Sequence, residues 1–235
     1  MATTSKEKLV KFLKQARSLV FVVLVVLSFR SSIADWNDVP SGSMKPNILE
    51  GDRIFVNKLA YDLKVPFTTW HLAAWDNPTR GEVVIFYSPA DGVRLVKRVI
   101  GVPGDVIELR HNRLFINGKE ADYQPLPAGL QGEISKEIGP EALGKEFAEE
   151  TLAGLKHPMM KNPLRPSEHQ SFGPVTVPDG KYFMMGDNRD NSNDSRYYGF
   201  VDRSLIVGRA SRVVVSVDPQ HSFKPRWERF FAPLP

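Results

Sequence analysis

Ser41 and Ser43, which flank a glycine, are the first residues along the chain that we consider as candidate nucleophiles. A serine hydroxyl attacks a carbonyl carbon readily only when a neighbouring base takes its proton. The chain contains no cysteine, so thiolate nucleophiles, thiolate metal sites and disulfides are excluded. A serine in this segment therefore needs a base that comes from elsewhere in the sequence.

The amine of Lys97 is the candidate base. Side chains two apart share one face of a strand, so in "VRLVKRVIG" Lys97 is in phase with Leu95 and Val99. Such a lysine lies either at the edge of a sheet, with its amine in water, or buried among apolar neighbours. Burial lowers the pKa of an amine, by up to about 3–5 units in the extreme, and a neutral amine can act as a general base. The strand alone leaves both positions open.

A second polar segment, "GDNRDNSNDSR" at 186–196, lies between two apolar runs. It is consistent with a surface turn or with a calcium loop built on Asp187, Asp190 and Asp194. The EF-hand spacing is not met, because Arg189 falls on the second ligand position. Asp194 and Arg196 are well placed for an ion pair that would stiffen the loop and hold a hydroxyl accurately.

Histidine does not supply an obvious base. The five histidines lie in expected loops or in the segment 120–172, and none is next to a serine motif. They are His71, His111, His157, His169 and His221. A serine–histidine–aspartate triad nevertheless stays open, because its members need not be adjacent in sequence.

Short strands and turns account for most of the chain after Trp36, which indicates a mainly β fold. The expected strands are 52–58, 82–89, 93–102, 106–110, 113–117, 175–177, 181–186 and 211–217. The pair 106–110 and 113–117 reads as a hairpin across His111-Asn112, and 68–81 reads as a loop. Within a variable insert at about 120–172, acids early and lysine late predict a helix over 139–158.

The amino-terminal segment combines basic residues with an uncharged apolar run. Residues 1–17 carry five basic side chains and one acid, and residues 18–29 carry no charge. We expect a basic cytoplasmic segment at 1–17, a membrane anchor helix at 18–35, and an extracytoplasmic domain at 36–235. A helix from Ala16 to Trp36 would rise about 30 Å, enough to cross a bilayer. A secretory signal cleaved near Ala34 and a buried core helix are the alternatives.

Composition limits the other classes of function. The 235 residues are 42% hydrophobic and 25% charged, with a formal net charge of +4, which is typical of a globular protein. The basic residues are spread without an interleaved aromatic stripe, which argues against nucleic-acid binding.

Four stretches together resemble bacterial type I signal peptidase, a serine–lysine peptidase of family S26. They are "PSGSMKP" (40–46), "GDRIFVNK" (51–58), "RLVKRVIGVPGD" (94–105) and "GDNRDNSNDSR" (186–196), in the family's order after a membrane anchor. The resemblance implies an antiparallel β catalytic domain with a smaller inserted subdomain, preceded by one transmembrane helix. It covers about Ala16 to Ser211, apart from the insert.

The resemblance also implies roles for individual residues. Ser43 matches the nucleophile, Lys97 the general base, Ser41 a donor of the oxyanion hole, and Ser192 the serine that orients the lysine. Asp194 and Arg196 match a supporting ion pair. The positions that match the shallow substrate pockets, for which plain core packing is the alternative, are Val39, Pro40, Met44, Ile48, Ile54, Leu95 and Val96.

The function implied by the resemblance is removal of amino-terminal signal peptides from exported preproteins at the bacterial inner membrane, without a metal or cofactor. Its expected partners are signal peptides that emerge from the secretion machinery and the phospholipid bilayer, not nucleic acid. Self-cleaving repressors share the serine–lysine chemistry but carry a DNA-binding domain where this chain has an apolar segment. A membrane-tethered binding protein with a decayed site is a further alternative.

Overall fold

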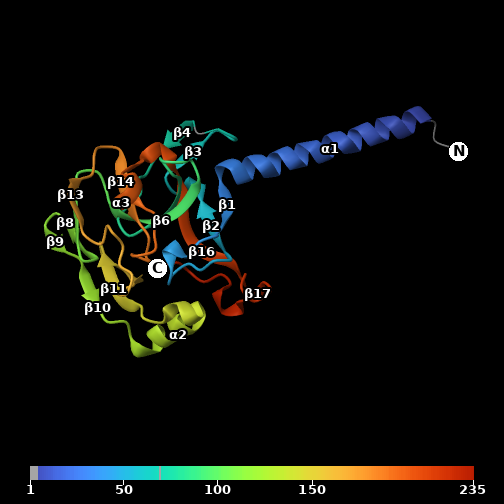
Figure 1. The fold of residues 1–235 in the computed structure, drawn as a ribbon. Coiled ribbons are helices and arrows are strands. Elements are labelled where there is room, and N and C mark those ends of the chain that lie inside the picture. Colours follow the sequence, from blue (N-terminus) through green and yellow to red (C-terminus); the bar gives the residue numbers. More distant parts are fainter. Residues whose placement is uncertain (1–4, 69) are drawn as a thin grey trace.

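The computed structural model describes residues 5–68 and 70–235 and shows a body of antiparallel strands from which a long helix projects (Figure 1). In the described part of the chain the largest sheet has eight strands, in the order β1-β2-β16-β5-β6-β14-β15, with β17 beside β16. They are β1 (Ala34–Asp38), β2 (Asp52–Asn57), β5 (Val83–Tyr87), β6 (Arg94–Gly101), β14 (Lys181–Met185), β15 (Val201–Asp202), β16 (Ile206–Asp218) and β17 (Lys224–Pro225). All of these pairs are antiparallel, which confirms the predicted mainly β fold.

β-Branched residues explain why the central strands form. Val83, Val84, Ile85 and Phe86 of β5 are all buried, so this strand is covered on both faces. One core cluster joins Val83 and Ile85 to apolar residues of β2 and β16, and another joins Val84 and Phe86 to residues of β6 and β14. The sheet that carries Lys97 is therefore packed on both sides.

A smaller sheet contains the predicted hairpin. Its order is β13-β7-β8-β9, with β13 (Phe172–Thr176), β7 (Val106–Arg110), β8 (Arg113–Ile116) and β9 (Lys119–Glu120). β7 and β8 pair across His111 and Asn112, whose φ angles of 52° and 62° suit a tight hairpin turn. The turn at 178–180 leads from β13 into β14, which belongs to the large sheet, so the strands on its two sides do not pair with each other.

The helix predicted over 139–158 is wrong. That stretch begins as a 3-10 turn, η3 (Gly139–Ala142), and continues into the hairpin of β11 (Glu146–Leu152) and β12 (Leu155–Lys161), with β10 (Asp122–Gln124) alongside. The helix of the insert, α2, comes earlier, at Ala128–Ile138. Ala153 and Gly154, with φ of 49° and 87°, close the hairpin. The expected loop 68–81 also contains a short strand, β4 (His71–Ala74), paired with β3 (Asp62–Lys64), while Thr69 lies outside the described residues.

The amino-terminal helix α1 spans Ser5–Ser32, and residues 1–4 of the expected basic segment lie outside the described residues. The large apolar side chains from Leu19 to Phe29 are 44–67% exposed, so the buried core helix is excluded. Among the described residues, Lys14–Ser32 is the one segment long and apolar enough to cross a membrane. The helix ends before the expected boundary at residue 35, because Ala34 begins β1 and places Trp36 on a strand.

A buried ion pair ties the insert to the rest of the body. Arg189 donates from Nη1 and Nη2 to Glu150 of β11 at 2.9 and 2.5 Å, and both side chains are fully buried. Burial, the largest single effect, raises the pKa of Glu150, but the charges and hydrogen bonds of Arg189 and His157 together outweigh it and hold that pKa below its usual value. The carboxylate stays charged because its partner is fixed opposite it.

Replacing Glu150 with Gln should lower the free energy of unfolding by about 3–5 kcal/mol, because Arg189 would be left as an uncompensated buried charge. Glu149→Gln, on the same strand, is the matched control: Glu149 pairs with the exposed Lys156, and such pairs contribute about 0–1 kcal/mol. Urea unfolding of the full chain in detergent measures both. Equal stability of the two variants would contradict the role given to this ion pair.

Candidate active site

The structure brings Lys97 and Ser43 together. Lys97 Nζ lies 2.6 Å from Ser43 Oγ and donates a further hydrogen bond to the carbonyl oxygen of Val96 at 3.1 Å. Lys97 comes from the middle of β6, and Ser43 from a 3-10 turn, η1 (Gly42–Met44). Lys97 is only 3% exposed, so of the two positions that its strand phase allowed, the buried one is correct.

Burial changes the acidity of this amine. Loss of hydration, the largest effect, lowers the pKa of Lys97 to about 8. The carboxylates of Asp194 and Asp187 act in the opposite direction, and Arg196 reinforces the lowering. An amine with this pKa is partly neutral near neutral pH and can accept a proton from the hydroxyl that it contacts.

Buried ion pairs shape the loop 186–196 around the amine. Arg196 pairs with Asp194 through Nε and Nη2, each at 2.9 Å, and Arg196 also donates to the carbonyl oxygen of Arg189. Arg98, the neighbour of Lys97 on β6, donates to both carboxylate oxygens of Asp187 at 2.9 and 2.8 Å. Asp194 also accepts from the backbone N–H of Arg196 at the start of α3 (Ser195–Tyr198). The loop is thus held in one conformation at both ends.

These contacts argue against the two other interpretations of the sequence, a calcium loop and a serine–histidine–aspartate triad. Asp187 and Asp194 are paired with arginines, and Asp190 accepts from Asn112 and from two backbone N–H groups, so the three carboxylates are not offered together to a calcium ion. Among the described residues Ser43 Oγ is hydrogen-bonded to Lys97 and to no histidine. A serine–histidine–aspartate triad on Ser43 is therefore absent from the described part of the chain.

The two other serines of the expected site lie close by but without strong contacts. Ser41 is exposed, precedes the 3-10 turn, and makes no capping bond to it. Ser192 is buried, and its hydroxyl has no hydrogen-bond partner among the described residues, so a bond from Ser192 to Lys97 is not formed here.

Gly186 is a position beside the candidate site that no reasoning from the sequence singled out. A Cβ at Gly186 would collide with Ser192 Oγ and with the carbonyl oxygen of Ser43. Its backbone N–H donates to Asp194 at 3.1 Å. Only a glycine lets the loop lie against the Ser43 turn, and this need becomes visible only when both neighbours are in place. The burial of Arg98 was also not predicted. Its position on β6 is in phase with the apolar Val96 and Ile100, just as Lys97 is in phase with Leu95 and Val99, and the same signal could have found it.

The residues expected to line substrate pockets divide into three groups. Val39, Met44, Ile48, Ile54 and Val96 form part of one buried apolar cluster. Ile48 and Ile54 expose no surface, as core packing requires. Leu95 packs against a different cluster, on the other face of β6, and Pro40 is exposed. The structure therefore gathers five of the seven in one cluster and places Leu95 against another.

Comparison with known proteins assigns the family. The model described as signal peptidase, peptidase S26, matches residues 12–215, and the chain belongs to this family. It is thus a hydrolase that acts on peptide bonds. The match confirms the resemblance seen in four short stretches of the sequence.

Relatives of this family match nearly the whole chain. Signal peptidase I of Pseudomonas fluorescens is 38% identical, with 94% of this chain and 78% of the relative covered. Signal peptidase I of Pseudomonas aeruginosa is 35% identical over the same shares. The enzyme of that name from Buchnera aphidicola subsp. Acyrthosiphon pisum is 31% identical, with 91% and 78% covered.

Gly186→Ala should reduce peptidase activity by roughly 10²-fold or more, because the added methyl group pushes apart Ser192 and the turn that holds Ser43, and a misplacement of about 1 Å has that effect. Cleavage of a short peptide substrate by the purified full chain measures it. Gly132→Ala in α2, where an added Cβ meets no atom within 4 Å, is the control and should leave activity unchanged. Full activity in Gly186→Ala would contradict the close packing of the loop against the turn.

Proposed function

We propose that the chain is a membrane-bound serine endopeptidase that removes amino-terminal signal peptides from exported preproteins, with Ser43 as nucleophile and Lys97 as general base. The observation that carries the proposal is the 2.6 Å contact between the Ser43 hydroxyl and an amine shielded from water. Membership of the signal peptidase family supports the substrate class. The geometry supports the chemistry.

The first step is proton transfer within this pair. Neutral Lys97 takes the proton of Ser43 as the serine oxygen attacks the carbonyl carbon of the last residue of the signal peptide. Lys97 then gives that proton to the leaving amine, so the peptide bond breaks and an acyl-enzyme ester remains on Ser43. In the second half, Lys97 deprotonates a water molecule that hydrolyses the ester and regenerates the serine.

The backbone N–H of Ser43 and the hydroxyl of Ser41 are the donors proposed for the oxyanion. Ser43 is in the first turn of η1, where backbone N–H groups have no acceptor within the helix. Ser41 directly precedes that turn with its side chain uncommitted to a cap. One such donor typically contributes about 2.7–4 kcal/mol to transition-state stabilisation. Ser192 is proposed to orient Lys97 when substrate excludes the remaining water.

The apolar cluster beside Ser43 is the proposed support for substrate specificity. Val39 and Val96 keep 5% and 9% of their surface, whereas the deeper members keep none or almost none. We infer that the exposed parts of Val39 and Val96 line shallow apolar depressions, which accept small side chains at the first and third positions before the cut and exclude large ones. Leu95, on the other face of β6, is left out of this proposal.

The helix α1 is the proposed membrane anchor. Its apolar residues have no protein cover, and a span of 19 residues rises about 28 Å, close to the thickness of the hydrocarbon core. The basic amino-terminal segment favours the cytoplasmic side, so the catalytic domain lies on the extracytoplasmic side. In a bacterial inner membrane, Ser43 then lies close to the outer face, where the cleavable end of a signal peptide emerges.

Lys97→Ala should lower processing of a preprotein by about 10²–10⁴-fold, the usual contribution of a general base. Folding should survive, because the change removes a buried amine and leaves no unpaired charge. Ser43→Ala should have a similarly large effect, and the double variant should lose little more, since the two residues act as a unit. Preprotein cleavage by the full chain in detergent measures all three.

Lys119→Ala, an exposed lysine of β9, is the control for loss of a positive charge. A serine-reactive probe that labels Ser43 in the control and not in Lys97→Ala would link the amine to the reactivity of the hydroxyl. Near-normal processing by Lys97→Ala would overturn the assignment of the base.

Peptidase activity should rise with pH and level off above an apparent pKa of about 8. The sign follows from the direction of the shift: the base acts only as the neutral amine, so activity falls about tenfold per pH unit below that pKa. A profile of kcat/KM against pH, over a range in which the fold is intact, tests this. An inflection near 10.5, the ordinary lysine value, would show that the amine is not shielded from water in solution.

A further inference from the structure

A cavity of about 570 Å³ lies where α1 joins the body, apart from the Ser43–Lys97 pair. Three basic side chains line it: Lys58 of the turn η2 (Lys58–Ala60), Lys64 of β3, and Arg94 at the start of β6. No carboxylate is among the described residues that line it. The lining is therefore suited to an anion.

The basic residues around this cavity exceed the acids that pair with them, although Lys64 is paired with Asp62 at 2.8 Å. Asp35 lies within 3.4 Å of Arg30, Lys58 and Arg94 together, so one carboxylate faces three cations. Arg94 Nη1 donates to Asp35 Oδ2 and to Asn37 Oδ1 at 3.4 Å each, which is long for a hydrogen bond. Its guanidinium, with five N–H donors, has donors left for a ligand.

A buried hydroxyl in the same lining lacks a partner. Ser32, the last residue of α1, is 5% exposed, and its Oγ makes no hydrogen bond to any described residue. A buried hydroxyl without a partner is unfavourable by about 1–3 kcal/mol, and native structures rarely leave one unexplained. Because Ser32 lines the cavity, a ligand oxygen there would satisfy it.

The rim of the cavity is apolar and exposed. Phe67 and Trp70, which also line it, are 64% and 74% exposed, and Leu72 and Trp75 of the same β3–β4 hairpin region are exposed as well. Figure 1 shows this hairpin near the end of α1 at which the helix enters the body. If α1 crosses a bilayer, the rim lies at the depth of the headgroups and upper acyl chains, where aromatic side chains are favoured.

We propose that this cavity binds the phosphate headgroup of an anionic phospholipid from the bilayer that α1 crosses. Arg94 and the hydroxyl of Ser32 donate to the phosphate oxygens, Lys58 and Lys64 add positive potential, and the acyl chains leave past Phe67 and Trp70. The apolar rim distinguishes a lipid from a free phosphate ion, which would gain nothing from it. The inference rests on the membrane position of α1 in the proposed function but not on the peptidase chemistry.

Native mass spectrometry of the full chain in detergent tests the site, with phosphatidylglycerol and phosphatidylcholine of identical acyl chains as probes. The wild-type chain should retain phosphatidylglycerol with an apparent affinity about tenfold or more above that for phosphatidylcholine. Arg94→Gln should remove about tenfold of that affinity, and Ser32→Ala about two- to tenfold, as expected for a charged and a neutral donor. Ser32→Ala removes only one hydroxyl, so it tests the site even if Arg94→Gln alters the fold.

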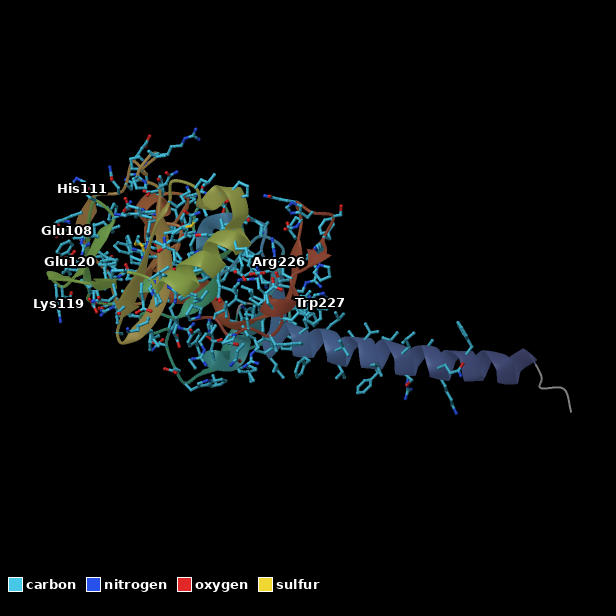
Figure 2. All side chains as sticks on the ribbon, turned by 90° about the horizontal axis from the view of Figure 1, so that it is seen from below. Glu108, His111, Lys119, Glu120, Arg226 and Trp227 are labelled. Atoms are coloured by element: carbon cyan, nitrogen blue, oxygen red, sulfur yellow. The ribbon has the colours of Figure 1, made fainter. Side chains whose placement is uncertain are left out.

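Lys119→Gln, at the end of the body away from α1 (Figure 2), is the control that removes one positive charge elsewhere and should change nothing. Equal retention of the two lipids, or equal retention by all variants, would overturn the proposal. So would displacement of phosphatidylglycerol by an equimolar amount of inorganic phosphate, which would indicate a free anion as the occupant.

Alkaline carbonate washing of membranes separates this inference from the proposed anchor. Release of the chain by the wash would show that α1 is not embedded, and would overturn the anchor and the lipid site together. Retention of the chain in the membrane combined with equal binding of both lipids would overturn the lipid site alone.

Discussion

A lysine amine held out of water beside a serine hydroxyl is the interaction on which the rest of this structure depends. Taking an ammonium out of water is unfavourable, so the fold must close around Lys97 without supplying enough negative charge to hold its pKa at the ordinary lysine value. Asp194 and Asp187 do lie within electrostatic reach of Lys97, but each is neutralised by its own arginine. The result is an amine whose acidity is set mainly by burial.

The neutralised carboxylates also explain why the loop 186–196 contains so many charges. Arg196 with Asp194, Arg98 with Asp187, and Arg189 with Glu150 are fully or almost fully buried pairs. Buried pairs of this kind add little net stability compared with apolar residues, but each has strict geometry. Since Glu150 belongs to the insert, and Glu141 of the insert pairs with Lys45 two residues after Ser43, the insert helps to position the turn.

Local pattern predicted the central strands and the β7–β8 hairpin, because alternation and turn residues are properties of neighbouring positions. For Lys97 it left an edge position and a buried one open, and only the packed structure decides between them. The helix expected over 139–158 failed because β11 pairs with β10 and β12, and its Glu150 pairs with Arg189, which is 39 residues away. Such contacts override the local helix preference of the segment. Gly186 was missed for the same kind of reason: Ser43 and Ser192 leave no room for a Cβ at this position, and that crowding appears only in the folded chain. The contacts of Ser41, Ser192 and Leu95 likewise depend on packing that spacing does not encode.

The junction between helix and body explains how the proposed site would keep a constant distance from the membrane. Only Ile33 separates the end of α1 from β1, and Lys58 donates to the carbonyl oxygens of Arg30 and Ser31 at the helix terminus. β1 pairs along its length with β2, which follows the Ser43 turn, so no flexible linker intervenes. Ala34 is itself a paired residue of β1, opposite Asn57. A cleavage near Ala34 would therefore have to open the edge of the large sheet, whereas the intact junction holds the turn that carries Ser43 at a fixed distance from the end of α1.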